Sequence, residues 1–390
     1  MTRPAVEVAD LLHKQGDRFM DQSPWLSYQQ LNVLRAIARC RTAALGGHID
    51  QCSQCDHQAI SYNSCRNRHC PKCQAQARQR WLAAREKELL NVPYFHVVFT
   101  LPHELNPLCR RNARILYDLL FRASADAMLE VAANPKRLGA QIGFISILHT
   151  WGQNLLLHPH VHCVVPAGGL AADRQRWINP KYAFFLPVQV LSSVFRAKFV
   201  DGLQKAFQEG KLAFSGSAAQ LANPKRFAIF VDSLFKQQWV VYAKPAFGAP
   251  TQVLRYLGRY THRVAISNHR LLAFDGTQVT FRWKDYAHGK KQKKMTLAAT
   301  EFLRRFSQHI LPRGFVRIRQ FGFLANTRRI TLLALARELL TATPKPPETC
   351  PTDASNGSTW RCPRCNGEMK IGLSLSARQL ASRCRPLDSS

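Results

Sequence analysis

Residues 158–168 read HPHVHCVVPAG, a stretch that combines a His-x-His pattern with a predicted strand. From His160 it is a short run rich in β-branched residues that ends in Pro and Gly, which predicts a strand. Successive side chains of a strand point to opposite faces, so His160 and His162 project from one face while Val161 packs inward on the other. Two imidazoles on one face make half of a metal site.

A third ligand can come from the preceding predicted strand, GFISILHTW (143–151). His149 lies eleven residues before His160, a distance over which a hairpin can fold back. Gln153 is the other nearby candidate. The expected site therefore contains His160 and His162 with either His149 or Gln153.

Two other groups of His-x-His enzymes do not fit the chain. The binuclear metallohydrolases use His-x-His-x-Asp-His, whereas Cys163, Val164 and Val165 follow His162 here. An amidohydrolase barrel needs a regular eightfold alternation of strands and helices, which the sequence does not show.

Short strand-like runs and longer helical runs alternate around this stretch. Strands are predicted at YFHVVFTL (94–101), GFISILHTW (143–151), RFAIFV (226–231), QWVVYAKP (238–245), RVAIS (263–267), RLLAF (270–274), TQVTFRW (277–283) and GFVRIRQFGF (314–323). Helices are predicted at about 27–44, 74–90, 106–132, 188–210 and 298–311. Asp275-Gly276 predicts a hairpin turn. This mixture predicts an α+β chain with one principal sheet.

A further predicted helix, GAPTQVLRYLGRYTHR (248–263), has Pro250 in its first turn and two tyrosines four residues apart. That spacing places Tyr256 and Tyr260 on nearly the same helix face, so both hydroxyls can address one site. Gly258 between them lowers helix stability by ~1 kcal/mol relative to Ala, which predicts close approach of another chain. A second series at the same spacing suits phosphate binding and comprises Arg255, Arg259 and Arg263.

Two Cys-x2-Cys pairs near the N-terminus have the spacing of a four-thiolate zinc site. The predicted ligands are Cys52, Cys55, Cys70 and Cys73. Other residues close enough to replace one ligand or to support a second ion are His48, His57, Cys65 and His69. Arg66 and Arg68 on the same loop suit contacts with phosphates.

The remaining cysteines give a weaker pattern. Cys362-x2-Cys365 could close a second zinc site with Cys350 upstream and Cys384 downstream, but the spacing of these partners is loose. Cys40, Cys109 and Cys163 are isolated in sequence and are expected to be buried apolar residues without a metal role.

The charge of the chain indicates a polyanionic partner. The sequence contains 55 Lys and Arg against 24 Asp and Glu, a formal net charge of +31. Hydrophobic residues make up 46%, which excludes a basic disordered tail. No apolar run approaches the ~20 residues that span a bilayer, and the N-terminus lacks a secretory h-region. We therefore expect a cytoplasmic, nucleoid-associated protein without a membrane partner, in which cysteines bind metal rather than form disulfides.

These motifs together resemble the HUH single-strand nucleases, specifically the two-tyrosine rolling-circle transposases of bacterial insertion sequences. His160-Val161-His162 matches the His-hydrophobe-His motif of that family, and Tyr256 with Tyr260 matches its tyrosine pair. The run SCRNRHCPKCQ (64–74) looks like the zinc-binding domain that precedes the nuclease. The resemblance covers roughly residues 20–330. It implies a five-stranded antiparallel sheet, flanked by helices, with the His pair on a central strand and Mg²⁺ or Mn²⁺ as the catalytic cofactor.

The resemblance also implies a division of the chain and an activity. An N-terminal zinc-binding helical domain that contacts DNA (1–90) would precede the HUH nuclease domain (91–335), followed by a linker and a cysteine-containing tail (336–390). The implied activity is transposition: single-stranded DNA at the insertion-sequence ends and target is nicked and rejoined through a 5′-phosphotyrosine. Two alternatives are a plasmid relaxase or replication initiator with the same chemistry, and a non-catalytic zinc-dependent DNA-binding regulator.

Overall fold

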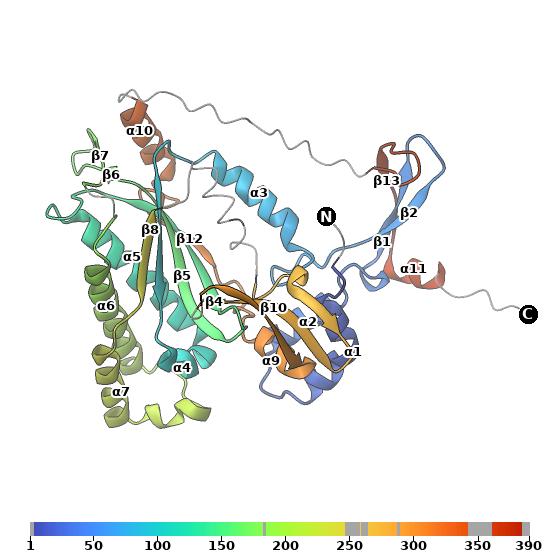
Figure 1. Cartoon of the computed structure of the whole chain (residues 1–390), viewed down its shortest axis with the longest axis horizontal. Coiled ribbons are helices and arrows are strands. Elements are labelled where there is room, and N and C mark those ends of the chain that lie inside the picture. The colour runs from blue at the N-terminus through green and yellow to red at the C-terminus, as the bar shows by residue number, and fades with distance from the viewer. Residues whose placement is uncertain are drawn as a thin grey trace, which may run out of the picture.

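A computed structural model describes residues 4–181, 185–245, 258, 264–286, 289–341 and 361–383. Figure 1 shows a large sheet with long helices on one side and a smaller helical body on the other. A narrow three-stranded ribbon lies at the far edge of the smaller body. The chain is a mixture of helices and antiparallel sheets, so the predicted α+β class is confirmed.

The principal sheet has five strands, each antiparallel to its neighbours, in the order β12-β4-β5-β3-β8. Its strands are β3 (Tyr94–Thr100), β4 (Gly143–Trp151), β5 (Leu157–Pro166), β8 (Val241–Pro245) and β12 (Ile318–Gly322). The central strand is β5, which carries the His-x-His motif. The expected five-stranded antiparallel sheet, with the His pair on a central strand, is therefore confirmed.

The two faces of this sheet are covered by different helices. Val161, Cys163 and Val165 point into the main core with α5 (Ala113–Ala133) and α6 (Val188–Gln208). On the opposite face, a second core contains residues of α10 (Arg329–Thr341), with Trp81 and Leu82 of α3 (Gln74–Glu86) packed against it. On the same face, the histidine end of β5 lines a cleft.

The N-terminal helices belong to a body that is shared with later parts of the chain. Helix α2 (Tyr28–Ala38) begins at Ser27, whose hydroxyl accepts the backbone N–H of Gln30 in a capping box. It packs with α1 (Val8–Asp21), α9 (Ala299–Ser307) and the sheet of β9 (Leu271–Phe274), β10 (Gln278–Asp285) and β11 (Lys291–Ala298) around one core. Residues 8–40 and 264–310 therefore contribute to one core.

Short elements complete the described fold. The ribbon consists of β1 (Gly47–Cys52), β2 (Gln58–Tyr62) and β13 (Met369–Leu375), followed by α11 (Ala377–Arg383). The remaining elements are α4 (Asn106–Arg111), β6 (Gly169–Leu170), β7 (Trp177–Ile178) and α7 (Pro224–Lys236). No helix in the described ranges is both long and apolar enough to cross a membrane.

Two predicted strands are wrong, and one predicted turn is confirmed. RFAIFV (226–231) lies inside α7 because the side chain of Asn223 accepts the N–H groups of Lys225 and Arg226 and caps the helix. The described part of RVAIS (264–267) forms no strand. At the Asp275-Gly276 turn, Gly276 has a φ of +100°, a backbone conformation that favours glycine. Of the expected linker and tail (336–390), residues 342–360 lie outside the described residues, and residues 336–341 belong to α10.

Candidate active site and metal centres

Three histidines converge on the face of the principal sheet that lies opposite the main core. His149 of β4 is paired directly with His160 of β5, and His162 follows two residues later on the same face. One ring nitrogen from each lies within 4.8 Å of the others, and the Nε2 atoms of His160 and His162 are 3.1 Å apart. Two nitrogens at right angles on one ion with bonds of about 2.1 Å would be about 3 Å apart. The three imidazoles therefore fit one divalent cation.

Hydrogen bonds orient two of these rings. Nδ1 of His160 lies 2.6 Å from the carbonyl oxygen of His158 and, as an N–H, donates to it, which leaves Nε2 of His160 as the metal-binding atom. Nδ1 of His162 lies 2.8 Å from Nε2 of His96 on β3. Sequence reasoning missed His96, although its place in the alternating run YFHVVFTL puts it on the His face of the sheet.

Burial keeps these imidazoles neutral. Desolvation lowers the pKa of His160 to about 3 and that of His96 to about 4, and it holds the pKa of His162 well below its ordinary value. Neutral imidazole is the form that binds a metal ion, so the cluster is ready to bind a cation at neutral pH. Gln153, the alternative third ligand, lines the same cleft, and its backbone carbonyl accepts a hydrogen bond from Arg270.

The cleft next to the histidines is basic and aromatic. Its volume is about 1050 Å³, and it lies between the His face of the principal sheet and the sheet of β9, β10 and β11. Its cationic lining residues are Arg110, Lys244, Arg270, Lys284, Lys290 and Arg304, and its exposed tyrosines are Tyr242 and Tyr286. No carboxylate is among the described residues that line it. Such a lining favours a phosphate backbone and allows bases to stack on aromatic rings.

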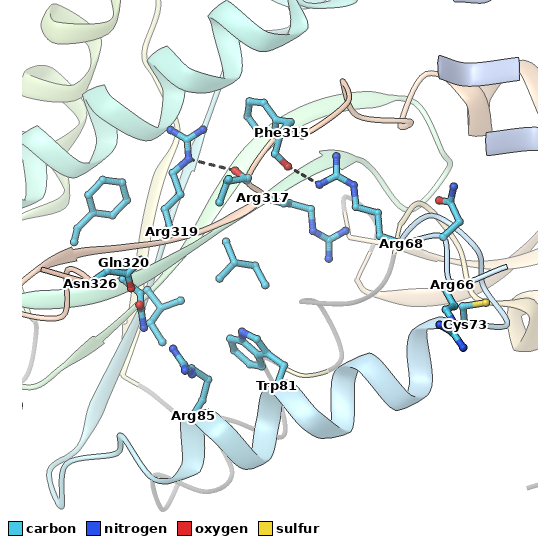
Figure 2. Close-up of a pocket in the computed structure, with 16 residues that line it drawn as sticks. Arg66, Arg68, Cys73, Trp81, Arg85, Phe315, Arg317, Arg319, Gln320 and Asn326 are labelled. Atoms are coloured by element: carbon cyan, nitrogen blue, oxygen red, sulfur yellow. Dashed lines mark hydrogen bonds between the residues drawn. The ribbon is translucent and has the colours of Figure 1, made fainter. Parts of the chain in front are cut away.

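A second basic pocket, of about 730 Å³, lies between the loop of residues 65–73 (the cysteine loop), α3 and β12 (Figure 2). Five arginines line it, among them Arg66 and Arg68, which the sequence predicts to contact DNA; the others are Arg85, Arg317 and Arg319. Arg68 also donates to the carbonyl oxygens of Pro312 and Phe315, which fixes the loop against residues that lead into β12. Burial, together with the nearby Arg68, lowers the pKa of Arg317 to about 9, so Arg317 stays charged at neutral pH.

Eight of the described cysteines form two clusters of four, and the predicted ligand set is corrected. Cys70 and Cys73 lie with Cys40 and Cys65, not with Cys52 and Cys55. The Sγ atom of Cys73 is 3.4 Å from that of Cys40 and 3.6 Å from that of Cys65. Cys40 follows α2 and has no Cys-x2-Cys partner, so its local sequence carried no signal of a metal role.

Cys52 and Cys55 instead lie with Cys362 and Cys365, which belong to the C-terminal tail. The backbone N–H of Gln54 donates to Sγ of Cys52 and lowers the pKa of that thiol to about 6. Both clusters contain only cysteine, the ligand set typical of structural zinc. Cys350 and Cys384, the partners weighed for the C-terminal pair, lie outside the described residues.

The predicted tyrosine pair also falls outside the described residues, together with Arg255, Arg259 and Arg263. The residue between the tyrosines, Gly258, is described and is helical. A Cβ atom at Gly258 would lie 2.7 Å from Cδ1 of Leu82 on α3, so the close approach at Gly258 is to a helix of the same chain and not, as the sequence predicts, to another chain. Gly258 therefore packs against α3, one of the helices on the His side of the sheet.

Comparisons with known proteins agree with these motifs. Residues 143–330 match the family model described as "Putative transposase", and residues 11–101 match that of the "Transposase zinc-binding domain". A "Putative transposase" of Sinorhizobium fredii is 50% identical over 96% of both chains. The transposase for insertion sequence element IS801 of Pseudomonas savastanoi pv. phaseolicola is 32% identical over 76% of this chain and 70% of its own length. No solved structure matches significantly. The chain belongs to the transposases of bacterial insertion sequences, the family that its His and Tyr motifs resemble.

Proposed function

We propose that this transposase nicks and rejoins single-stranded DNA at the ends of its insertion sequence through a 5′-phosphotyrosine intermediate. The observation that supports this most is the convergence of His149, His160 and His162 beside a basic cleft without a described carboxylate. A site for a divalent cation next to a phosphate-binding surface suits cleavage of a phosphodiester. Because DNA is the substrate, we also expect association with the nucleoid.

The three histidines would hold Mg²⁺ or Mn²⁺, with Mn²⁺ the better match to imidazole nitrogen. When bound, the ion would polarise the scissile phosphate and stabilise the charge that develops on it. The chain itself orients the ligands: the carbonyl of His158 and the ring of His96 fix two of the imidazoles. This preorganisation means that the site needs little rearrangement before it binds a cation.

Tyr256 and Tyr260 would be the nucleophiles. Each phenol can attack a phosphate, form an ester with the 5′ end and release a 3′ hydroxyl. The phenol is weakly nucleophilic at neutral pH because its pKa is ~10, and Arg255, Arg259 or His262 would stabilise the phenolate. The ester conserves the energy of the broken bond, so strands can be rejoined without ATP. Two tyrosines allow one end to stay attached while a second strand is cut.

The two basic pockets supply a path for the strand. The cleft beside the histidines would hold the nucleotides around the scissile bond, with bases against Tyr242 and Tyr286. The pocket with Arg66 and Arg68 would hold a further part of the strand next to the zinc-binding loop. Phosphate contacts of this kind position DNA without reading its sequence.

The experiment that tests this proposal is incubation with a single-stranded end oligonucleotide and Mn²⁺, followed by detection of a covalent protein-DNA adduct. Wild type should form the adduct, and the double variant Tyr256→Phe/Tyr260→Phe should not. Either single variant should keep some cleavage but impair complete transposition. Tyr28→Phe, which changes an exposed tyrosine at the start of α2 that lines neither pocket, is the matched control and should form the adduct. An adduct in the double variant, or one mapped to another residue, would refute the assignment.

A further inference from the structure

The ribbon of β1, β2 and β13 brings the two ends of the chain together. Cys52 and Cys365 are separated by 313 residues, yet their Sγ atoms are 3.4 Å apart. The Sγ atoms of Cys55 and Cys362 are 3.7 Å apart, and all four sulfurs lie within 4.8 Å of one another. A tetrahedral zinc with bonds of about 2.3 Å requires sulfurs about 3.8 Å apart. The four thiols therefore surround a point that suits one zinc ion.

The two Cys-x2-Cys turns have the same backbone arrangement. In the first, the N–H of Gln54 donates to Sγ of Cys52 over 3.4 Å, and the N–H of Arg364 does the same for Cys362 in the second. The N–H of the first cysteine in each turn donates to the carbonyl five residues later, that of His57 in one turn and of Gly367 in the other. Cys52 and Cys362 therefore occupy equivalent positions in two turns of the same geometry.

Backbone pairing joins the two turns. Strand β13 pairs antiparallel with β1, so that Cys52 is opposite Met369. The N–H of Ser53 in the first turn donates to the carbonyl of Glu368, next to the second. The tail is therefore an edge strand of the N-terminal hairpin.

Apolar burial alone gives this ribbon little stability. Its own core contains three buried residues, and two of them are the ligands Cys52 and Cys362, with Met369 as the third. A domain with so small a core needs a metal or a disulfide to stay folded. Structural zinc supplies folding free energy directly.

We propose that Cys52, Cys55, Cys362 and Cys365 bind a second structural zinc, which fastens the C-terminal tail to the N-terminal zinc-binding region. Each thiol loses its proton as its sulfur binds the ion, and four thiolates leave no position open for water or substrate. Residues 361–365 lie outside both family-matched segments, 11–101 and 143–330. The site does not depend on the nuclease chemistry proposed above.

Zinc content of the full chain tests the proposal. With the histidine site removed by His160→Ala/His162→Ala, the chain should bind two zinc ions, and adding Cys362→Ser/Cys365→Ser to that background should leave one. The ion that remains, on the cluster of Cys40, reports that the rest of the N-terminal region is folded. The matched control Cys350→Ser/Cys384→Ser should keep two. An unchanged count in Cys362→Ser/Cys365→Ser, loss of both ions there, or loss of one in the control would overturn the proposal.

Thiol alkylation tests the pairing between the two ends. In the wild-type chain with zinc, Cys362 and Cys365 should be protected from alkylation, and Cys52→Ser/Cys55→Ser should make both reactive. That variant changes only residues more than 300 positions away, so exposure of the tail cysteines would follow from loss of the shared ion. If both tail cysteines stay protected in it, the shared site does not exist.

Discussion

The second basic pocket, beside the cysteine loop, allows a quantitative prediction about DNA binding. Arg66 and Arg68 line it together with Arg85, Arg317 and Arg319. Arg85 is paired with Glu88 at 3.0 Å and Arg319 with Asp118, which reduces their contribution to phosphate binding. We therefore assign two phosphate contacts to the loop arginines and test them with Arg66→Gln/Arg68→Gln. Glutamine removes both charges and keeps a polar side chain at each position.

The expected magnitude follows from counterion release. For single strands, each phosphate contact contributes about 0.7 to the slope of log affinity against log salt, so two contacts contribute about 1.4. Between 50 and 200 mM salt, wild type should therefore lose about sevenfold more affinity than the variant. Fluorescence anisotropy with a labelled single-stranded end oligonucleotide measures the slope in each case.

A charge-matched control separates a local contact from a general loss of charge. Lys225 and Lys236 are exposed on α7, which packs with the main core on the face of the sheet opposite the histidines. Lys225→Gln/Lys236→Gln removes the same charge and should leave the slope unchanged. An equal reduction in this control, or an unchanged slope in Arg66→Gln/Arg68→Gln with its zinc retained, would refute the reasoning.

Two further predictions concern the buried histidines. Mn²⁺ at about 100 times its dissociation constant should raise the free energy of unfolding of wild type by about 2.7 kcal/mol. The variant His160→Ala/His162→Ala should lose this gain. If Mn²⁺ shifts the thermal unfolding of the variant as much as that of wild type, the three histidines do not form the site. His309 accepts from the hydroxyl of Thr150 at Nδ1 and donates from Nε2 to the carbonyl of Leu155, and burial lowers its pKa to about 4. The unfolded chain then binds the proton first, near pH 6.5, so His309 should cost about 3 kcal/mol of stability as the pH falls from neutral to 4. Denaturant unfolding of wild type and His309→Gln at both pH values should show this difference, and parallel pH profiles would contradict it.

The histidine cluster could be predicted from local sequence. His149, His160 and His162 belong to two strands joined by a short connection, and strand periodicity determines the face on which each imidazole lies. The structure agrees with this placement because neighbouring strands joined by few residues have few alternative registers. His96 was missed because it lies on β3, 66 residues before His162, and no local pattern shows that β3 pairs with β5.

The helix at RFAIFV shows where a local pattern misled. Its aromatic and β-branched residues favour a strand, but Asn223 and Pro224 provide a helix start. Phe227, Val231 and Leu234 then point to one buried face at helical spacing. Capping and packing against the main core outweighed the weak intrinsic preference of these residues.

The cysteines show what only the tertiary structure decided. Each Cys-x2-Cys turn is a local feature, and the sequence by itself was enough to predict a zinc site built on such turns. Which cysteines share an ion depends on contacts between distant segments. Cys40, just after α2, joins Cys70 and Cys73, whereas the pairing of β13 with β1 brings Cys362 to Cys52. Cys52-x2-Cys55 and Cys70-x2-Cys73 have a compatible spacing, so the sequence could not distinguish that pairing from the observed ones. Contacts between residues hundreds of positions apart have no local sequence pattern. The free energy of the whole fold determines which of them form, and neighbouring residues do not.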